Sequence, residues 1–400
     1  MPPIPYAPVW SSPFRSFGLL GVGYGVALMA TWAAIQAGIV PADAIPAVDR
    51  GWHGHEMLFG FAGAIVCAIV LTALPGWAAT PEPGAAWLAS VASLWIVGRI
   101  AWWAQGALPA ALVVAAACAL WIALALRLAV ELLRVAERRY LALVVVVAGI
   151  LAGEALALSG QSALGLSTMV HSLALLYALA AGVFTPVFTG NHLRLHRRGD
   201  LAAARMPLEV AALASIVVFA VLDLAGAAPA TRTVAAFAAA ALNAIRMVRW
   251  RGWRVADAPL LWTMHAGYAW LVVALALAGL SAAGDPAAAR AWLHAFTVGA
   301  LGSMMIGLLT RVVLKHTGRP LVLPAAIVVA HLLVQVAAVA RVGAAWAPDG
   351  RAAITASALA WTAAFALYLG SFAAYLVRPS LPRTDNPLTD ETREPPNRGR

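Results

Sequence analysis

The sequence predicts an all-α fold, a polytopic membrane bundle of about twelve transmembrane helices with both termini in the cytoplasm. Of its 400 residues, 62% are hydrophobic and only 11% are charged, whereas an average soluble domain has about 45–50% apolar and about 25% charged residues. Apolar stretches of about 20 residues also recur along the chain, and each is long enough to cross about 30 Å of hydrocarbon. The composition therefore excludes a water-soluble globule and predicts the lipid bilayer as a partner.

Short polar segments and segments rich in proline and glycine separate the apolar stretches. Because these residues interrupt helices, we place the helix ends there. The run of alanines gives 231–249 the weakest signal. We predict one transmembrane domain over 1–377 and a disordered cytoplasmic tail over 378–400, which is polar and proline-rich. The predicted spans are 18–38, 54–78, 85–105, 109–132, 140–159, 166–189, 207–226, 231–249, 259–282, 288–312, 321–340 and 353–376.

The basic side chains fall mostly on one side of this topology. With the N-terminus in the cytoplasm, twenty lysines and arginines lie on the cytoplasmic side and five lie outside, while Arg99 and Arg127 fall within spans. Cytoplasmic loops of membrane proteins carry such an excess of basic residues. The net charge of +10 therefore orients the chain in its membrane, and we expect no binding of nucleic acid.

Ionisable side chains within the spans are the residues most informative about function, because a charge in hydrocarbon is costly and usually marks a functional site. Six of them share one depth near the outer side, on five different spans: His53, His55, Arg99, Glu154, His171 and His294. Imidazoles that converge in an apolar bundle are typical ligands of haem iron and copper. We therefore predict the four histidines to be metal ligands; the alternative is that each is an ordinary buried histidine with satisfied hydrogen bonds.

The segment 51–57, Gly-Trp-His-Gly-His-Glu-Met, has the sharpest local pattern. Two residues turn an α-helix by about 200°, so His53 and His55 would point to nearly opposite sides and would not share one metal ion. Either the glycines bend the chain here, or the two imidazoles serve different centres. A spacing of three or four residues would place Glu56 or Met57 on the face of His53.

Other buried residues have two interpretations each. Arg99 would hold a haem propionate or form an ion pair with Glu154 or Glu56, and the two glutamates would orient ligands or move protons. His265 lies toward the inner side and is the next candidate metal ligand, or part of a proton path. The glycines that follow His294 would admit either a flat macrocycle or a closely packed neighbouring helix.

Two segments resemble the signatures of a known family. The run 52–60, Trp-His-Gly-His-Glu-Met-Leu-Phe-Gly, is similar to the signature of the NnrS family, and the segment from His294 through Met304 and Met305 to Pro320 matches the pattern of the same family. The resemblance covers the chain up to its tail. It implies a haem- and copper-containing protein of the bacterial inner membrane, linked to nitric oxide metabolism and resistance to nitrosative stress, often alongside denitrification.

The resemblance implies nitric oxide as a small-molecule ligand and leaves open the reaction, the electron donor and whether the protein is an enzyme. The catalytic subunit of a terminal oxidase also has about twelve spans, haem and copper, but this chain lacks the adjacent histidine pair and the His-Pro-Glu-Val-type helix of that class. The alternative function is a proton-coupled secondary transporter with a path lined by histidine and glutamate. The chain shows no clear two-fold internal repeat in its favour.

Overall fold

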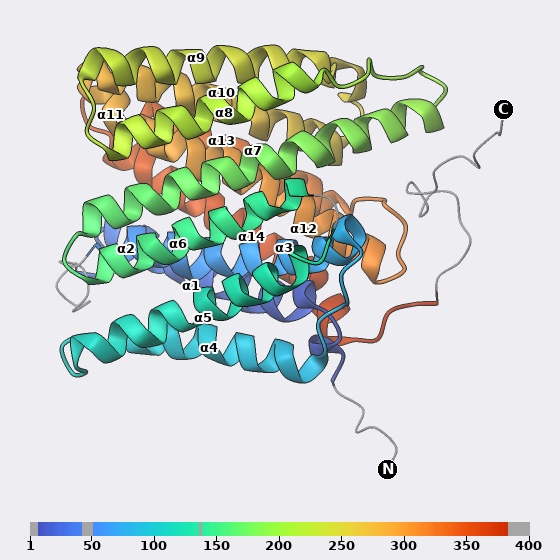
Figure 1. Ribbon diagram of the computed structural model, residues 1–400, viewed down its shortest axis with the longest axis horizontal. Helices are drawn as coiled ribbons and strands as arrows, with labels where there is room; N and C mark the ends of the chain where they lie inside the picture. Colours follow the sequence, from blue (N-terminus) through green and yellow to red (C-terminus); the bar gives the residue numbers. More distant parts are fainter. Residues whose placement is uncertain (1–6, 42–50, 136–137, 383–400) are drawn as a thin grey trace.

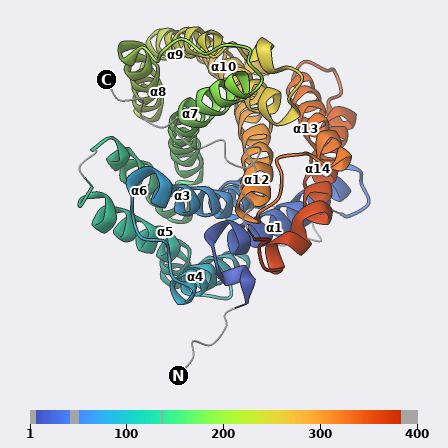
Figure 2. The same ribbon diagram turned by 90° about the vertical axis from the view of Figure 1, so that its right-hand side faces the viewer.

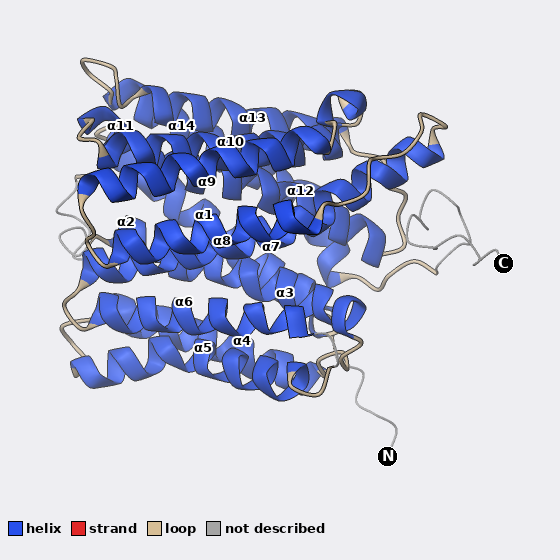
Figure 3. Ribbon diagram, turned by 45° about the horizontal axis from the view of Figure 1, so that its top comes forward, coloured by secondary structure: helices blue, strands red, loops and turns tan. Residues whose placement is uncertain are grey.

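The structure is a computed structural model of the chain that describes residues 7–41, 51–135 and 138–382. Within these ranges the helices run side by side and no β-strand forms (Figure 1, Figure 3). The predicted all-α bundle is therefore confirmed. Most of the predicted disordered tail, 383–400, lies outside the described residues.

Twelve helical segments of the described chain correspond one for one to the predicted spans. Ten of them are long and apolar enough to cross a membrane, so the chain is a multi-pass membrane protein. These ten are α1 (Pro13–Gln36), α2–η4–α3 (Trp52–Ala78), α4 (Ala85–Trp103), α5 (Ala110–Leu132), α7 (Ser162–Leu195), α8 (Met206–Leu224), α10 (Pro259–Ala282), α11–η7–α12 (Pro286–His316), α13 (Ala325–Gly343) and α14 (Arg351–Val377).

The other two segments are α6 (Ala142–Leu158) and α9 (Pro229–Arg249). α6 is apolar but has only 17 residues, slightly fewer than the roughly 20 that a span needs. α9 is long enough, but its apolar residues are diluted by alanine and by polar residues such as Asn243 and Arg246. Both segments still pack within the bundle, between α5 and α7 and between α8 and α10.

The twelve segments form three consecutive groups of four, which cover 13–132, 142–249 and 259–377. The last helix of each group packs against the first helix of the next: α5 against α6, α9 against α10, and α14 against α1. The last of these contacts closes the three groups into a ring, which Figure 2 shows end on.

The second segment of each group lies toward the inside of this ring. η4 packs against α7, α12 packs against α3 and α1, and α7 packs against α10. In the segments 52–78 and 286–316, 78% and 83% of the apolar 18-residue stretch is buried inside the bundle, compared with 17% in α8. The predicted ligands His55, His171 and His294 therefore lie on the three inner segments.

The first and last described segments meet at one end of the bundle. Arg15 of α1 is buried, and its Nη1 donates to the carbonyl oxygens of Tyr375, Leu376 and Arg378 at 2.9, 2.9 and 2.7 Å. These carbonyls end α14 and have few helical partners of their own. We call the opposite end, where α2 and α11 begin (Figure 1), the distal end. That it faces away from the cytoplasm remains a prediction from the charge distribution.

Candidate functional site

Two inner segments contain a π-helical stretch directly after a predicted ligand. η4 (Glu56–Ala62) follows His55, and η7 (Ala295–Leu301) follows His294. Both stretches share the pattern His-x4-Gly-x2-Gly, at 55–63 and 294–302. π-helical turns are rare and occur frequently at functional sites. The repeated pattern is a sequence feature that would have drawn attention to both segments together.

The first glycine of each pattern permits close helix packing. A Cβ added at Gly60 would lie 2.7 Å from the ring of Tyr24 in α1, and one added at Gly299 would lie 2.5 Å from the ring of Trp270 in α10. α1 and α10 are the first helices of the first and third groups, so the two groups repeat the same contact. At Gly299, the structure shows helix packing, which was one of the two interpretations of these glycines.

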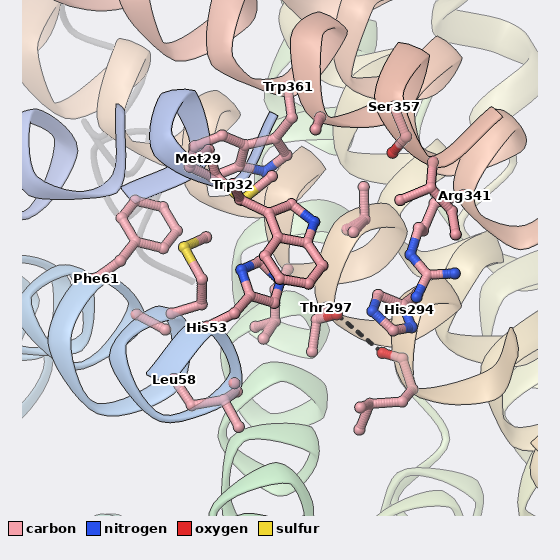
Figure 4. Close-up of a pocket in the computed structure, with 18 of the residues that line it drawn as sticks. Met29, Trp32, His53, Leu58, Phe61, His294, Thr297, Arg341, Ser357 and Trp361 are labelled. Atoms are coloured by element: carbon pink, nitrogen blue, oxygen red, sulfur yellow. Dashed lines mark hydrogen bonds between the residues drawn. The ribbon is translucent and has the colours of Figure 1, made fainter. Parts of the chain in front are cut away.

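His53 and His294 line one cavity at the distal end (Figure 4). The cavity holds about 780 Å³ of space free of protein atoms, part of it continuous with the outside. The lining includes three basic residues, His53, His294 and Arg341, and no aspartate or glutamate among the described residues.

The imidazole of His53 is held by an aromatic contact. It stacks on the indole of Trp32, with ring centroids 4.3 Å apart and planes 17° apart. The Nδ1 atoms of His53 and His294 are both buried and have no hydrogen-bond partner among the described residues. A buried polar atom without a partner costs about 1–3 kcal/mol. The two nitrogens therefore mark positions where a bound group would supply the missing interaction.

Thioethers add soft donors to the cavity wall. Met29, Met57 and Met305 all line it. Met57 follows His53 by four residues and shares its side of the helix, as one of the two predicted spacings requires, while Glu56 contacts His55 instead. Imidazole and thioether together suit copper, and imidazole suits haem iron.

His55 faces away from the cavity, into a buried charged cluster. Its Nδ1 lies 2.8 Å from Glu56 Oε1, and its Nε2 lies 3.6 Å from Glu154 Oε2. Arg99 joins the two carboxylates, since Nη1 donates to Glu56 at 2.7 Å and Nη2 donates to Glu154 at 3.1 Å. Both glutamate side chains are fully buried. The imidazoles of His53 and His55 thus lie in different places, and that they serve two different centres stays a prediction.

Aromatic side chains enclose this cluster. The Tyr24 hydroxyl donates to Glu56 and accepts from Trp103 Nε1 at 2.7 Å. Trp102 stacks on His55, with ring centroids 4.9 Å apart. Arg99 forms the ion pairs that were the alternative to holding a propionate. The cofactor-binding roles predicted for Arg99, Glu56 and Glu154 stay predictions.

His171 lies in a third place, with carboxylate and arginine partners of its own. Its Nε2 is 2.9 Å from Asp223 Oδ2, and Asp223 Oδ1 accepts from Arg232 at 3.2 Å. The imidazole also lies 6.2 Å from the ring of Trp292, two residues before His294. A carboxylate bound to one imidazole nitrogen orients the ring. His171 is therefore held beside the segment that carries His294 and is not part of the cavity lining.

His265 lies nearer the other end of the bundle. Its Nε2 is 2.9 Å from Thr189 Oγ1, and Gly252 of η6 (Gly252–Val255) packs against its ring. Across the part of the chain that the structure describes, no group of three or more His, Cys, Asp or Glu side chains is arranged to hold a metal ion. Of the five predicted histidine ligands, the structure brings two together, His53 and His294.

Each of the three groups of helices has a corresponding pair of residues near the distal end. Each combines a histidine of the second segment with a charged residue of the third: His55 and Arg99, His171 and Asp223, His294 and Arg341. In the first two pairs the histidine contacts a carboxylate, whereas both residues of the third pair line the cavity. Sequence position places Arg341 directly after the predicted span 321–340, in an outer loop, and so gives no sign that it lines the cavity.

The fold and this site define a multi-pass helical membrane protein with a histidine- and methionine-lined cavity near one end of its bundle. The chain belongs to the NnrS family: the family model described as NnrS protein matches residues 8–380. This confirms the resemblance stated from the segments 52–60 and 294–320. No curated protein matches the chain.

Proposed function

We propose that the protein is a redox-metal protein of the bacterial inner membrane that acts in the nitric oxide response. It binds nitric oxide and detoxifies it, or handles its iron–nitrosyl products, with a haem or copper group held by His53 and His294. One observation carries the proposal: the two imidazoles have buried, unpaired Nδ1 atoms and line the same cavity. Membership of the NnrS family supports the link to nitric oxide.

The residues of the cavity fit such a group. Both histidines offer a free ring nitrogen, and Met57 and Met305 offer thioethers, so the donor set contains imidazole and soft sulfur. The stacking contact with Trp32 holds the imidazole of His53 in one orientation. When bound there, the metal would supply the redox-active centre for nitric oxide.

The side of the wall formed by α1 and α14 favours a small uncharged ligand. Met29, Ile354, Ala358 and Trp361, from α1 and α14, are apolar and line the same space. The Thr297 hydroxyl is engaged by the Leu293 carbonyl oxygen at 2.9 Å and offers no free donor proton. Because nitric oxide is small and nearly apolar, such a wall would admit it at little desolvation cost.

The experiment that tests this proposal is a visible absorption spectrum of detergent-purified protein, oxidised and then reduced with dithionite, with copper measured by elemental analysis on the same sample. We expect a Soret band that shifts when nitric oxide is added, bound copper, or both. His53→Ala and His294→Ala should each lose the metal. His265→Ala is the matched control, because this histidine is buried in the same bundle away from the cavity. A featureless spectrum without copper, in folded protein from haem-replete cells, would contradict the proposal.

A proton-coupled secondary transporter is the second candidate, and one observation favours it. In the buried cluster, His55 Nε2 and Glu154 Oε2 face each other at 3.6 Å, and neither has a hydrogen-bond partner among the described residues. This function predicts proton-coupled uptake into vesicles that Glu154→Gln abolishes and that metal removal does not affect. Uptake that requires the metal, or survives this substitution, would exclude it.

A further inference from the structure

Arg341 of α13 projects into the cavity beside His294 (Figure 4). It is half-buried, and no carboxylate of the described residues forms an ion pair with it. Burying a charge is costly unless an opposite charge or hydrogen bonds compensate for it. Among the described residues, the cavity lining therefore contains one guanidinium and two imidazoles, and no carboxylate.

The arginine of the first group that corresponds to Arg341 has carboxylate partners. Arg99 occupies the corresponding third helix, and its guanidinium lies between Glu56 and Glu154. Glu56 directly follows the histidine of the first His-x4-Gly-x2-Gly pattern, whereas Ala295 directly follows His294 in the second. The second pattern therefore has no carboxylate at the position that neutralises Arg99 in the first.

We propose that the cavity is an anion site in which Arg341 binds a planar group with two oxygen atoms on one centre. A guanidinium presents two parallel N–H donors to such a group, as it does to a carboxylate. Two sources carry this chemistry: a carboxylate of a bound haem, or a free small oxoanion such as nitrite or formate. The first source rests on the proposed function, and the second does not.

The free-anion arm uses metal-free, full-length protein in detergent. Formate and nitrite are titrated separately by calorimetry at constant ionic strength. Arg341→Gln removes the charge and should weaken binding at least tenfold, the effect of losing one charge-assisted hydrogen bond (about 1.4 kcal/mol per tenfold). Arg351→Gln is the matched control, because Arg351 is exposed at the same end, outside the cavity lining, and donates to the Gln36 carbonyl oxygen. It should bind both anions like the wild type.

The cofactor arm titrates the same proteins with haem and with its dimethyl ester, followed by absorbance. If Arg341 holds a haem carboxylate, Arg341→Gln should weaken haem binding about tenfold and leave ester binding unchanged. Arg341→Lys keeps the charge and guards against a folding defect, so it should retain part of the affinity. A tenfold effect in either arm supports the anion site and identifies its source.

Equal binding by Arg341→Gln and the wild type in both arms would overturn the anion site. This result is distinguishable from failure of the proposed function. Protein that binds formate or nitrite through Arg341 but holds no haem or copper would refute the proposed function alone. Protein that binds metal through His53 and His294 but is indifferent to Arg341→Gln would refute the anion site alone.

Discussion

Arg99 and Arg246 are both buried arginines paired with glutamate, but their surroundings differ in how completely the polar atoms are paired. Arg246 Nε donates to Glu209 at 2.7 Å, and Nη1 donates to the Ala178 carbonyl oxygen at 2.9 Å and to the Tyr268 hydroxyl at 3.0 Å. Tyr268 donates in turn to Asn243 at 2.7 Å. These contacts join α7, α8, α9 and α10 through one positive and one negative charge.

The Arg99 cluster is not fully paired. One guanidinium faces the two carboxylates of Glu56 and Glu154. Arg99 Nε, His55 Nε2 and Glu154 Oε2 have no hydrogen-bond partner among the described residues. A partly satisfied buried network destabilises a fold and is typical of a functional site, whereas a satisfied one makes the packing more rigid. The Arg246 network therefore serves to join helices, and the functional role of the Arg99 cluster stays a prediction.

Arg99→Met should have the largest effect on stability, because it leaves two fully buried carboxylates without their arginine partner. Removing one partner of a buried ion pair costs about 3–5 kcal/mol. The free energy of unfolding, measured by denaturation in detergent, should fall by that amount. The triple variant Arg99→Met, Glu56→Gln, Glu154→Gln is the control and should recover much of the loss. A loss that persists in the triple variant would show that packing, not charge, is responsible.

Arg246→Met should cost less, about 2–3 kcal/mol. The carboxylate it leaves behind, Glu209, is 17% exposed and regains some hydration. The same denaturation experiment measures this loss. Tyr268→Phe, which removes a single hydrogen-bonding hydroxyl, is the milder control and should cost about 1 kcal/mol. A cost for Arg246→Met above that of Arg99→Met would reverse the order that burial predicts.

Neutralising one carboxylate in each network sharpens the comparison. Glu209→Gln removes the sole counter-charge of Arg246 and should cost about 1.5–3 kcal/mol, the range for hydrogen bonds to charged groups. Glu154→Gln leaves Arg99 paired with Glu56, and the glutamine oxygen can still accept from Arg99, so the substitution should cost about 1 kcal/mol or less. The quantity to compare is the loss of unfolding free energy, relative to the wild type, that each of the two substitutions causes. Equal losses would mean that the second carboxylate of the Arg99 cluster contributes as much to stability as Glu209 does.

The hydrophobic pattern was sufficient to predict the fold. Each predicted span corresponds to a helical segment, because a stretch of about 20 apolar residues has few alternatives to a helix in lipid. The span with the weakest signal, 231–249, became α9, which does not meet the composition of a membrane-crossing helix. Its buried Arg246 and Asn243 take part in the hydrogen-bond network that joins α7, α8, α9 and α10.

The site was predicted only in part. Sequence gives the depth of a residue along its helix, and it selected His53 and His294 correctly as members of one cavity. The direction in which a side chain points around the helix depends on helix rotation and on the π-helical turns. For this reason His55 and His171 share the predicted depth of His53 and His294, although each has a different partner. Arg341 enters the cavity through the packing of α13, which a single sequence does not reveal.

The smallest effect should come from the ion pair between Arg198 and Asp257, outside the membrane-spanning segments. The two side chains lie 2.8 Å apart and are 43% and 50% exposed. The hydrogen bond from Arg198 lowers the pKa of Asp257 below its ordinary value of 3.8.

Because the folded pKa is lowered, any stabilisation from this pair is present above about pH 4 and disappears as the pH falls through the folded pKa. Water and salt screen the exposed charges, so Asp257→Asn should leave the free energy of unfolding at neutral pH within experimental error. A loss as large as that of Arg99→Met would mean that the number of ion-pair contacts, and not their burial, determines the contribution of an arginine. The contrast between Arg99 and Arg246 would then lose its physical basis.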